Sequence, residues 1–234
     1  MRATTASTTR STTPPEAVGR AAVFDLDRTL LPGSSLLALA RAMARRRMLS
    51  GQQLVSGLAM DRAFRWRGAD DDQVDRLRTA ALRQVAGVEA ATLLALVDEI
   101  GHGLARQVVP GARLLLRRHL DAGDFVVILS ASPHELVEAV ATRLGAHRAV
   151  GTRAECVDGR YTGRLHEPFC YGPGKLARLE QELGPAALAD ATAYADSCSD
   201  IPVLRASREA VAVNPDRALR RVAEARKWPI IRFG

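Results

Sequence analysis

The 234-residue chain has few cysteines, few aromatic residues and no long apolar run. Its three cysteines, Cys156, Cys170 and Cys198, have no CxxC spacing, so we predict neither a zinc site nor a disulfide framework, and we expect a cytoplasmic protein. No apolar run approaches the roughly 18–20 residues that cross a bilayer, so we expect no membrane span. The remaining composition, 47% hydrophobic and 25% charged, is typical of a soluble globular domain.

Lysine is also scarce. The chain has 33 basic and 26 acidic residues, a net charge of +7, but Lys175 and Lys227 are its only lysines. A basic excess can indicate a polyanionic partner. Here the arginines are scattered with few aromatic residues between them, which is more typical of GC-rich codon usage, and we predict no nucleic-acid partner. A lysine in such a chain is therefore a candidate functional residue.

Short apolar runs that end in a polar residue recur along the chain. They occupy 21–25, 124–130, 193–196 and 210–214, and they end at Asp25, Ser130, Asp196 and Asn214. Helical patterns at 111–122, 133–144, 173–184 and 215–226 alternate with them. Strands that alternate with helices predict an α/β fold with a parallel sheet, whose ligand binds beyond the carboxyl ends of the strands.

Three segments depart from this alternation. Residues 1–19 are rich in Thr, Ser and Pro, and we expect a disordered leader. Residues 34–108 have helical spacing and lie between Pro-Gly pairs, so we expect three or four helices forming a cap, while residues 20–33 and 109–234 form the core. Residues 153–165 contain an Asp-Gly pair between short extended runs, which predicts a β-hairpin.

The polar residues at the strand ends suggest phosphate chemistry. Asp25 and Asp27, two residues apart at a strand end, could hold Mg²⁺ or supply a nucleophile, or they could simply cap a turn. Ser130 could bind an anion or cap a helix. Lys175 stands in a first helical turn, which the helix dipole disfavours, so it is either a phosphate ligand or a solvated cation.

Asp196 and Asp200 supply a second pair of carboxylates, although Asp200 could equally cap the helix that follows it.

The ordered set Asp25-x-Asp27-x-Thr29, Ser130, Lys175 and Asp196-x-x-x-Asp200 resembles the four motifs of the haloacid dehalogenase superfamily. The helical insertion resembles the cap of its subclass IB, the phosphoserine-phosphatase-like branch. The resemblance covers about residues 20–234. It implies a Rossmann-like parallel sheet core with an inserted all-helical cap of the C1 type, and Mg²⁺ as cofactor.

The resemblance also implies a role for each matched residue. Asp25 would attack phosphorus and bind Mg²⁺, and Asp27 would act as general acid and base while its carbonyl touches the metal. Asp196 would be a further metal ligand. Outside the metal, Asp200 would hold Lys175 or a metal-bound water, and Thr29 would orient the first loop. The residues expected to bind the phosphoryl oxygens are Ser130, Ala131 and Lys175.

Three positions differ from the phosphoserine phosphatases. Ser34 stands where they carry a Glu that reads the substrate amine, Ala131-Ser132 replaces a Gly-Gly pair, and Ser199 replaces an Asn. The resemblance therefore leaves phosphoserine doubtful as the substrate. The candidate substrate residues of the cap are Ser34, Arg62 and Arg65, with Arg67, Phe64 and Trp66 close to them.

We expect an enzyme that hydrolyses a small phosphorylated metabolite with Mg²⁺, acting as a monomer or homodimer. Two alternatives stay open at this point. A phosphotransferase would pass the same aspartyl-phosphate to an alcohol. A non-catalytic protein would merely bind a phosphometabolite or polyanion, although the carboxylates at positions 25, 27 and 196 count against it.

Overall fold

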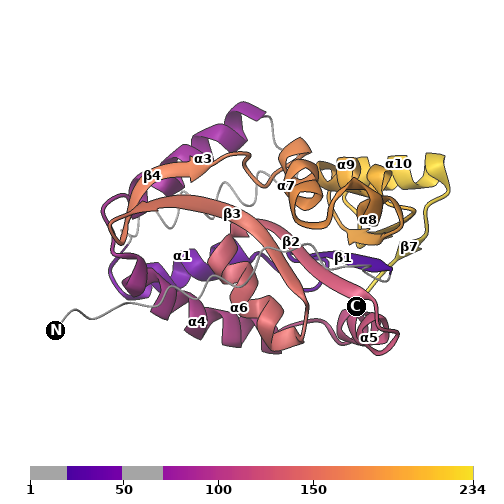
Figure 1. Ribbon diagram of the computed structural model, residues 1–234, viewed down its shortest axis with the longest axis horizontal. Coiled ribbons are helices and arrows are strands. Elements are labelled where there is room, and N and C mark those ends of the chain that lie inside the picture. The colour runs from indigo at the N-terminus through magenta and orange to yellow at the C-terminus, as the bar shows by residue number, and fades with distance from the viewer. Residues whose placement is uncertain (1–19, 49–70, 234) are drawn as a thin grey trace.

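The computed structural model describes residues 20–48 and 71–233, and its centre is a seven-stranded sheet in the order β4-β3-β2-β1-β5-β6-β7 (Figure 1). The strands are β1 (Ala21–Asp25), β2 (Phe125–Pro133), β3 (Arg148–Val157), β4 (Arg160–His166), β5 (Thr192–Ala195), β6 (Glu209–Val213) and β7 (Ile230–Ile231). Neighbouring strands pair in parallel, except that β4 is antiparallel to β3. The predicted parallel α/β fold is confirmed.

Helices cover both faces of the sheet. They are α1 (Ser35–Arg45), α3 (Asp71–Val85), α4 (Ala90–Arg106), α5 (Pro110–Asp121), α6 (His134–Leu144), α7 (Pro173–Leu183), α8 (Pro185–Ala189), α9 (Ile201–Ala206) and α10 (Arg217–Arg226). Figure 1 shows α1, α4, α5 and α6 on one face and α7 to α10 on the other, with α3 beside β4. None of the helices in the described ranges is both long and apolar enough to span a bilayer.

The central strands β1 and β2 are apolar up to their carboxyl ends because each face is buried against helices. Phe24 and Ile128 belong to the core cluster on the side of α1, α4, α5 and α6. Their neighbours Val23 and Val127 belong to a second cluster on the side of α7 to α10. Successive side chains of a strand point to opposite faces of the sheet, and here both faces are buried in hydrophobic clusters.

Strand β1 lies where the topology reverses. Its neighbours are β2 on one side and β5 on the other, and Asp25 is in register with Leu129, the residue before Ser130. The carboxyl ends of β1, β2 and β5 thus deliver Asp25, Ser130 and Asp196 to one edge of the sheet. In open α/β sheets this switch point is where ligands bind.

The inserted segment packs closely on the core. Helix α4 crosses α6 where Gly101 meets Ala139, and a Cβ atom at Gly101 would lie 2.5 Å from the Ala139 Cβ. Helix α3 packs on β4, and the Arg78 guanidinium lies over the Phe169 ring. Within the described part, the insertion is helical as predicted; its residues 49–70 lie outside the described residues.

The predicted hairpin is confirmed as β3–β4. Its turn residues Asp158 and Gly159 both have positive φ angles, 49° and 76°, as a two-residue type I′ turn requires. The first half of β3, which pairs in parallel with β2, and the short β7 were not predicted. Both are too short to give a periodic signal, and each forms because a paired neighbour already stands beside it.

Candidate functional site

A buried lysine joins two buried aspartates at the carboxyl end of β1. The Lys175 Nζ donates to Asp25 Oδ1 at 2.7 Å and also to Asp200 Oδ1, and all three residues are at most 6% exposed. Burial acts to lower the pKa of Lys175, but the charges of Asp200 and Asp25 raise it well above its usual value. The predicted neighbours Asp25, Lys175 and Asp200 are therefore in direct contact, although residues 25 and 175 are far apart in sequence.

The glycines before Lys175 allow helix α7 to begin at this point. Gly172 has φ 54° and ψ −126°, a backbone conformation that essentially glycine alone adopts. A Cβ atom at Gly174 would lie 1.9 Å from the Phe169 carbonyl oxygen, so this position has no room for a side chain. The Gly-Pro-Gly run thus sets the position from which Lys175 reaches Asp25.

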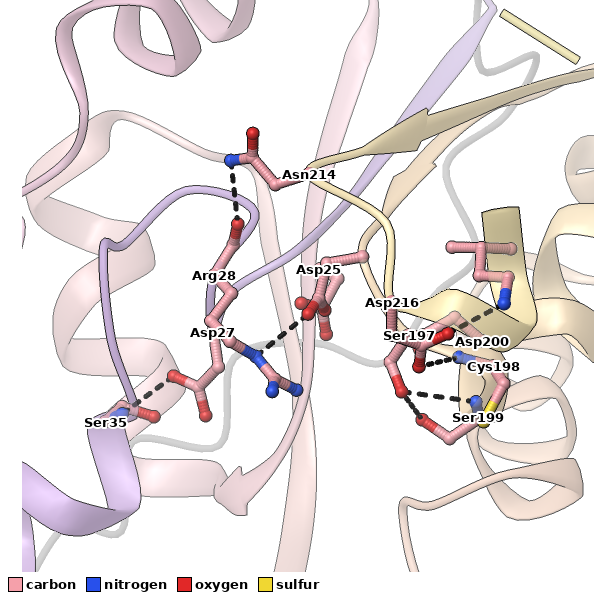
Figure 2. Close-up of polar contacts among 12 residues, drawn as sticks. Asp25, Asp27, Arg28, Ser35, Ser197, Cys198, Ser199, Asp200, Asn214 and Asp216 are labelled. Carbon is pink, nitrogen blue, oxygen red and sulfur yellow. Dashed lines mark hydrogen bonds and ion pairs between the residues drawn. The ribbon is translucent and has the colours of Figure 1, made fainter. Parts of the chain in front are cut away.

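Asp196 is paired with an arginine that sequence reasoning did not identify. The Arg28 Nε lies 2.9 Å from Asp196 Oδ2. The Arg28 carbonyl accepts a hydrogen bond from Asn214 Nδ2 at 3.4 Å (Figure 2). Burial and the charge of Asp25 raise the pKa of Asp196 well above its usual value, while Arg28 acts in the opposite direction. Arg28 stands inside the first motif, at φ 62°, and its position between Asp27 and Thr29 was the available signal.

Asp27 is held by the first residue of α1. Its Oδ1 accepts a hydrogen bond from the Ser35 backbone N–H at 2.8 Å (Figure 2). Burial, followed by the charge of Asp25, raises the pKa of Asp27 to about 6, although hydrogen bonds from Ser35 and the charge of Lys175 oppose the shift. A carboxyl group with this pKa can both give and take a proton near neutral pH.

Ser130 lies near the carboxyl end of strand β2. It is 2% exposed, and its Oγ accepts a hydrogen bond from the Ser132 N–H at 3.1 Å. The Ala131 carbonyl accepts a hydrogen bond from Thr152 Oγ1 at 2.6 Å, which ties this segment to β3. The 130–132 segment is therefore held on one side by strand β3.

Three carboxylates could hold a cation. Asp25, Asp196 and Asp200 each offer one oxygen, and these oxygens lie within 4.8 Å of one another. Asp200 Oδ2 is buried and has no hydrogen-bond partner in the described part of the chain, so it could ligate a metal or accept a hydrogen bond from a metal-bound water. Hard carboxylate oxygens are the ligands Mg²⁺ prefers, and the donor set therefore fits this ion.

The segment after β6 braces the Asp196–Asp200 loop. Asp216 accepts a hydrogen bond from the Cys198 N–H at 2.9 Å (Figure 2). Its own N–H donates to the Asp196 carbonyl at 2.8 Å. Asp216 also caps α10 by accepting from the Leu219 N–H at 2.7 Å. One side chain thus fixes both the helix start and the loop.

The remaining predicted residues lie as follows. Thr29 is buried, but its hydroxyl has no hydrogen-bond partner among the described residues. The Ser34 Oγ caps α1 by accepting from the Leu37 N–H at 3.3 Å. Arg62, Arg65 and Arg67, with Phe64 and Trp66, lie outside the described residues, as does the 1–19 leader.

Comparison with known proteins agrees with this geometry. The model of a family described as haloacid dehalogenase-like hydrolase matches residues 22–205. The probable phosphatase Rv3661 of Mycobacterium tuberculosis is 37% identical over 94% of this chain and 80% of its own length. Phosphoserine phosphatase SerB1 of the same species is also 37% identical, over 94% and 73%.

A crystal structure of a Bordetella pertussis protein of unknown function has a TM-score of 0.79 at 29% identity, over 92% of this chain and 99% of that one. The family match, the two relatives and this shared fold all concern the segment that carries the four motifs. The chain therefore belongs to the haloacid dehalogenase-like hydrolase family, in the branch that contains the phosphoserine phosphatases.

Proposed function

We propose that the chain is a Mg²⁺-dependent phosphatase that hydrolyses a small phosphomonoester through an aspartyl-phosphate on Asp25. The observation that carries the proposal is the buried Lys175 ammonium between Asp25 and Asp200 at the switch point of the sheet. Phosphoryl transfer depends mainly on positioning and on neutralising charge, and a buried cation beside a buried nucleophile supplies both.

In the first half of the reaction, an oxygen of Asp25 attacks phosphorus and forms a P–O bond. The ester P–O bond on the opposite side breaks, and the leaving alkoxide takes the proton of Asp27. Lys175, Ser130 and the Ala131 N–H bind the transferring phosphoryl oxygens. The alcohol leaves with the proton, and phosphorus stays on Asp25.

In the second half, Asp27 is a carboxylate and accepts a proton from water. The water oxygen attacks phosphorus, the bond between phosphorus and the Asp25 oxygen breaks, and inorganic phosphate leaves. Asp27 is then protonated again and the cycle is closed. A pKa of about 6 suits both steps because neither protonation state is strongly disfavoured near neutral pH.

Mg²⁺, when bound, neutralises charge on the phosphoryl group and on the carboxylates around it. The residues that would hold it are Asp25, Asp196 and the backbone carbonyl of Asp27. Asp200, whose Oδ1 accepts from Lys175, would orient that lysine and present its free Oδ2 toward water around the metal.

The substrate is a small phosphorylated metabolite. Phosphoserine deserves a test because a 37% identical relative is named for it, while Ser34, at the position of an amine-reading Glu, counts against it. Residues 34–108 would cover the site and contact the organic part of the substrate. The three free cysteines are in keeping with a cytoplasmic enzyme, which would act as a monomer or homodimer.

The test is phosphate release from phosphoserine, histidinol phosphate, glycerol phosphate and phosphocholine, with Mg²⁺ or with EDTA. We expect metal-dependent release that Asp25→Asn abolishes and Asp27→Asn lowers about 10²–10⁴-fold. The matched control is Asp190→Asn, which changes an exposed aspartate paired with Arg208 and should leave the rate unchanged. Wild-type rates in Asp25→Asn contradict the proposal. If an added alcohol becomes phosphorylated, the enzyme is a phosphotransferase and the proposal of hydrolysis is wrong.

A further inference from the structure

Two buried serines meet where helix α1 approaches the 130–132 segment of β2. Ser35 is the first residue of α1 and is 0% exposed, and Ser132 is 2% exposed. Their Oγ atoms lie 2.7 Å apart, a hydrogen bond between residues 97 positions apart in the chain. Because both hydroxyls are buried, water does not compete for this contact.

Each serine has a second contact that reaches a residue of the proposed mechanism. The Ser35 N–H donates to Asp27 Oδ1 at 2.8 Å. The Ser132 N–H donates to Ser130 Oγ at 3.1 Å. The four residues therefore form one continuous line of hydrogen bonds, with the general acid at one end and the phosphate-binding hydroxyl at the other.

Helix capping does not account for the Ser35 hydroxyl. The capping residue of α1 is Ser34, whose Oγ accepts from the Leu37 N–H. The Ser35 side chain is thus available to join α1 to the 130–132 segment.

Strand β3 contacts the 130–132 segment as well. The Thr152 Oγ1 donates to the Ala131 carbonyl, and Gly151 lies so close that a Cβ there would be 2.9 Å from the Ser132 carbonyl oxygen. Strand β3 thus holds the segment from one side, and Ser35 holds it from the other.

We propose that Ser35 and Ser132 are positioning residues that fix Asp27 relative to the phosphoryl group held at Ser130. The inference rests on the proposed function, because it assigns Asp27 the proton that the leaving alcohol takes. A general acid must stand within hydrogen-bond reach of that oxygen, and a displacement of about 1 Å can cost about 10²-fold in rate. The Ser35–Ser132 pair sets this distance, since one serine holds the acid and the other holds the anion site.

The test compares two esters that differ in their need for the acid. An alkyl phosphate releases an alkoxide, which must be protonated, whereas p-nitrophenyl phosphate releases a phenolate that is stable without a proton. Ser35→Ala, Ser132→Ala and the double variant are compared with wild type. Steady-state kinetics are measured on the alkyl ester that wild type hydrolyses fastest. On p-nitrophenyl phosphate, the rate of p-nitrophenolate release is measured in a single turnover, with enzyme in excess.

We expect each single variant to lower kcat on the alkyl ester about 10–100-fold, with KM within about threefold. The single-turnover rate of p-nitrophenolate release should stay within about threefold of wild type. The double variant should be no slower than the slower single variant, because both changes break the same contact. Ser207→Ala, which removes a hydroxyl that donates only to the Val203 carbonyl among described residues, is the control and should match wild type on both esters.

Equal losses on the two esters would show that the serines merely support the fold, and would overturn the inference. An alkyl-ester kcat within twofold of wild type, or additive losses in the double variant, would also overturn it. Circular dichroism on each variant identifies loss of folding. The wild-type protein tests the proposed function separately: if it releases phosphate from neither ester, the proposed function fails and the inference fails with it.

Discussion

Replacing Lys175 with methionine removes the cation between Asp25 and Asp200 while keeping an unbranched side chain of similar length. Two buried carboxylates then face each other without compensation. Removing one partner of a buried ion pair costs about 3–5 kcal/mol, because the remaining charge stays desolvated. In a domain of this size each kcal/mol lowers Tm by about 2–4 °C, so we expect Tm to fall by about 6–20 °C.

The loss should depend on pH in a defined direction. Burial raises the pKa of Asp200 to about 6, Lys175 acts to lower it, and Asp25 raises it further. Without the lysine this pKa rises. A carboxyl group whose pKa is raised by folding contributes stability below its unfolded pKa, and that stability is lost as pH rises through the folded pKa. The variant's deficit is therefore smaller at pH 5, where Asp200 carries a proton, than at pH 7.5.

The assay is urea unfolding in EDTA, followed by circular dichroism at both pH values. Adding Asp200→Asn to Lys175→Met should recover part of the lost stability, because it removes one unpaired charge. Lys227→Met, at an exposed position, should change the free energy of unfolding by less than about 0.5 kcal/mol. A loss below about 1 kcal/mol at pH 7.5, or a loss equal at the two pH values, would refute the assignment of Lys175 as the buried counter-charge.

Three other changes test separate parts of the structure. Arg28→Gln removes the cation paired with a candidate metal ligand, so calorimetry at low salt should find Mg²⁺ bound about 3–30-fold more tightly; weaker binding contradicts this. Burial and nearby arginines lower the pKa of His134 to about 4. The free energy of unfolding should therefore fall by up to about 3 kcal/mol as pH drops from about 6.5 to 4. In urea titrations, the His134→Gln variant should not show this pH dependence. Gly101→Ala should destabilise by about 1–3 kcal/mol because its Cβ meets Ala139, whereas Gly103→Ala on the same helix, with open space around it, should not; equal effects exclude the close α4–α6 contact as the cause.

The main parts of the site were predictable because they depend on local patterns. Asp25, Ser130 and Asp196 each follow a short apolar run, and parallel strands bring such ends to one edge of the sheet. Lys175 could be singled out by its place in a first helical turn of a chain with almost no lysine. These local patterns were enough to expect that the four residues lie close together.

The contacts that position these residues were not predictable in this way. Arg28 was passed over because its left-handed backbone and its pairing with Asp196 depend on how β1 and β5 meet. Ser132 could be identified only as a departure from a Gly-Gly pair, since its partner Ser35 lies in the inserted segment. Such contacts depend on the packing of distant elements, so a single sequence does not show which partner each of these residues meets.

The charges of the site explain why several of its pKa values move together. The carboxylates of Asp25, Asp27, Asp196 and Asp200 are joined by only two cations among the described residues that contact them, Lys175 and Arg28. This leaves an excess of two negative charges in a buried space, and burial together with that excess raises the pKa of Asp27, Asp196 and Asp200. One Mg²⁺ carries the charge that balances it. The same excess that raises these pKa values is therefore the electrostatic reason to expect a divalent cation, and metal binding should lower the raised pKa of its ligand Asp196 and release protons.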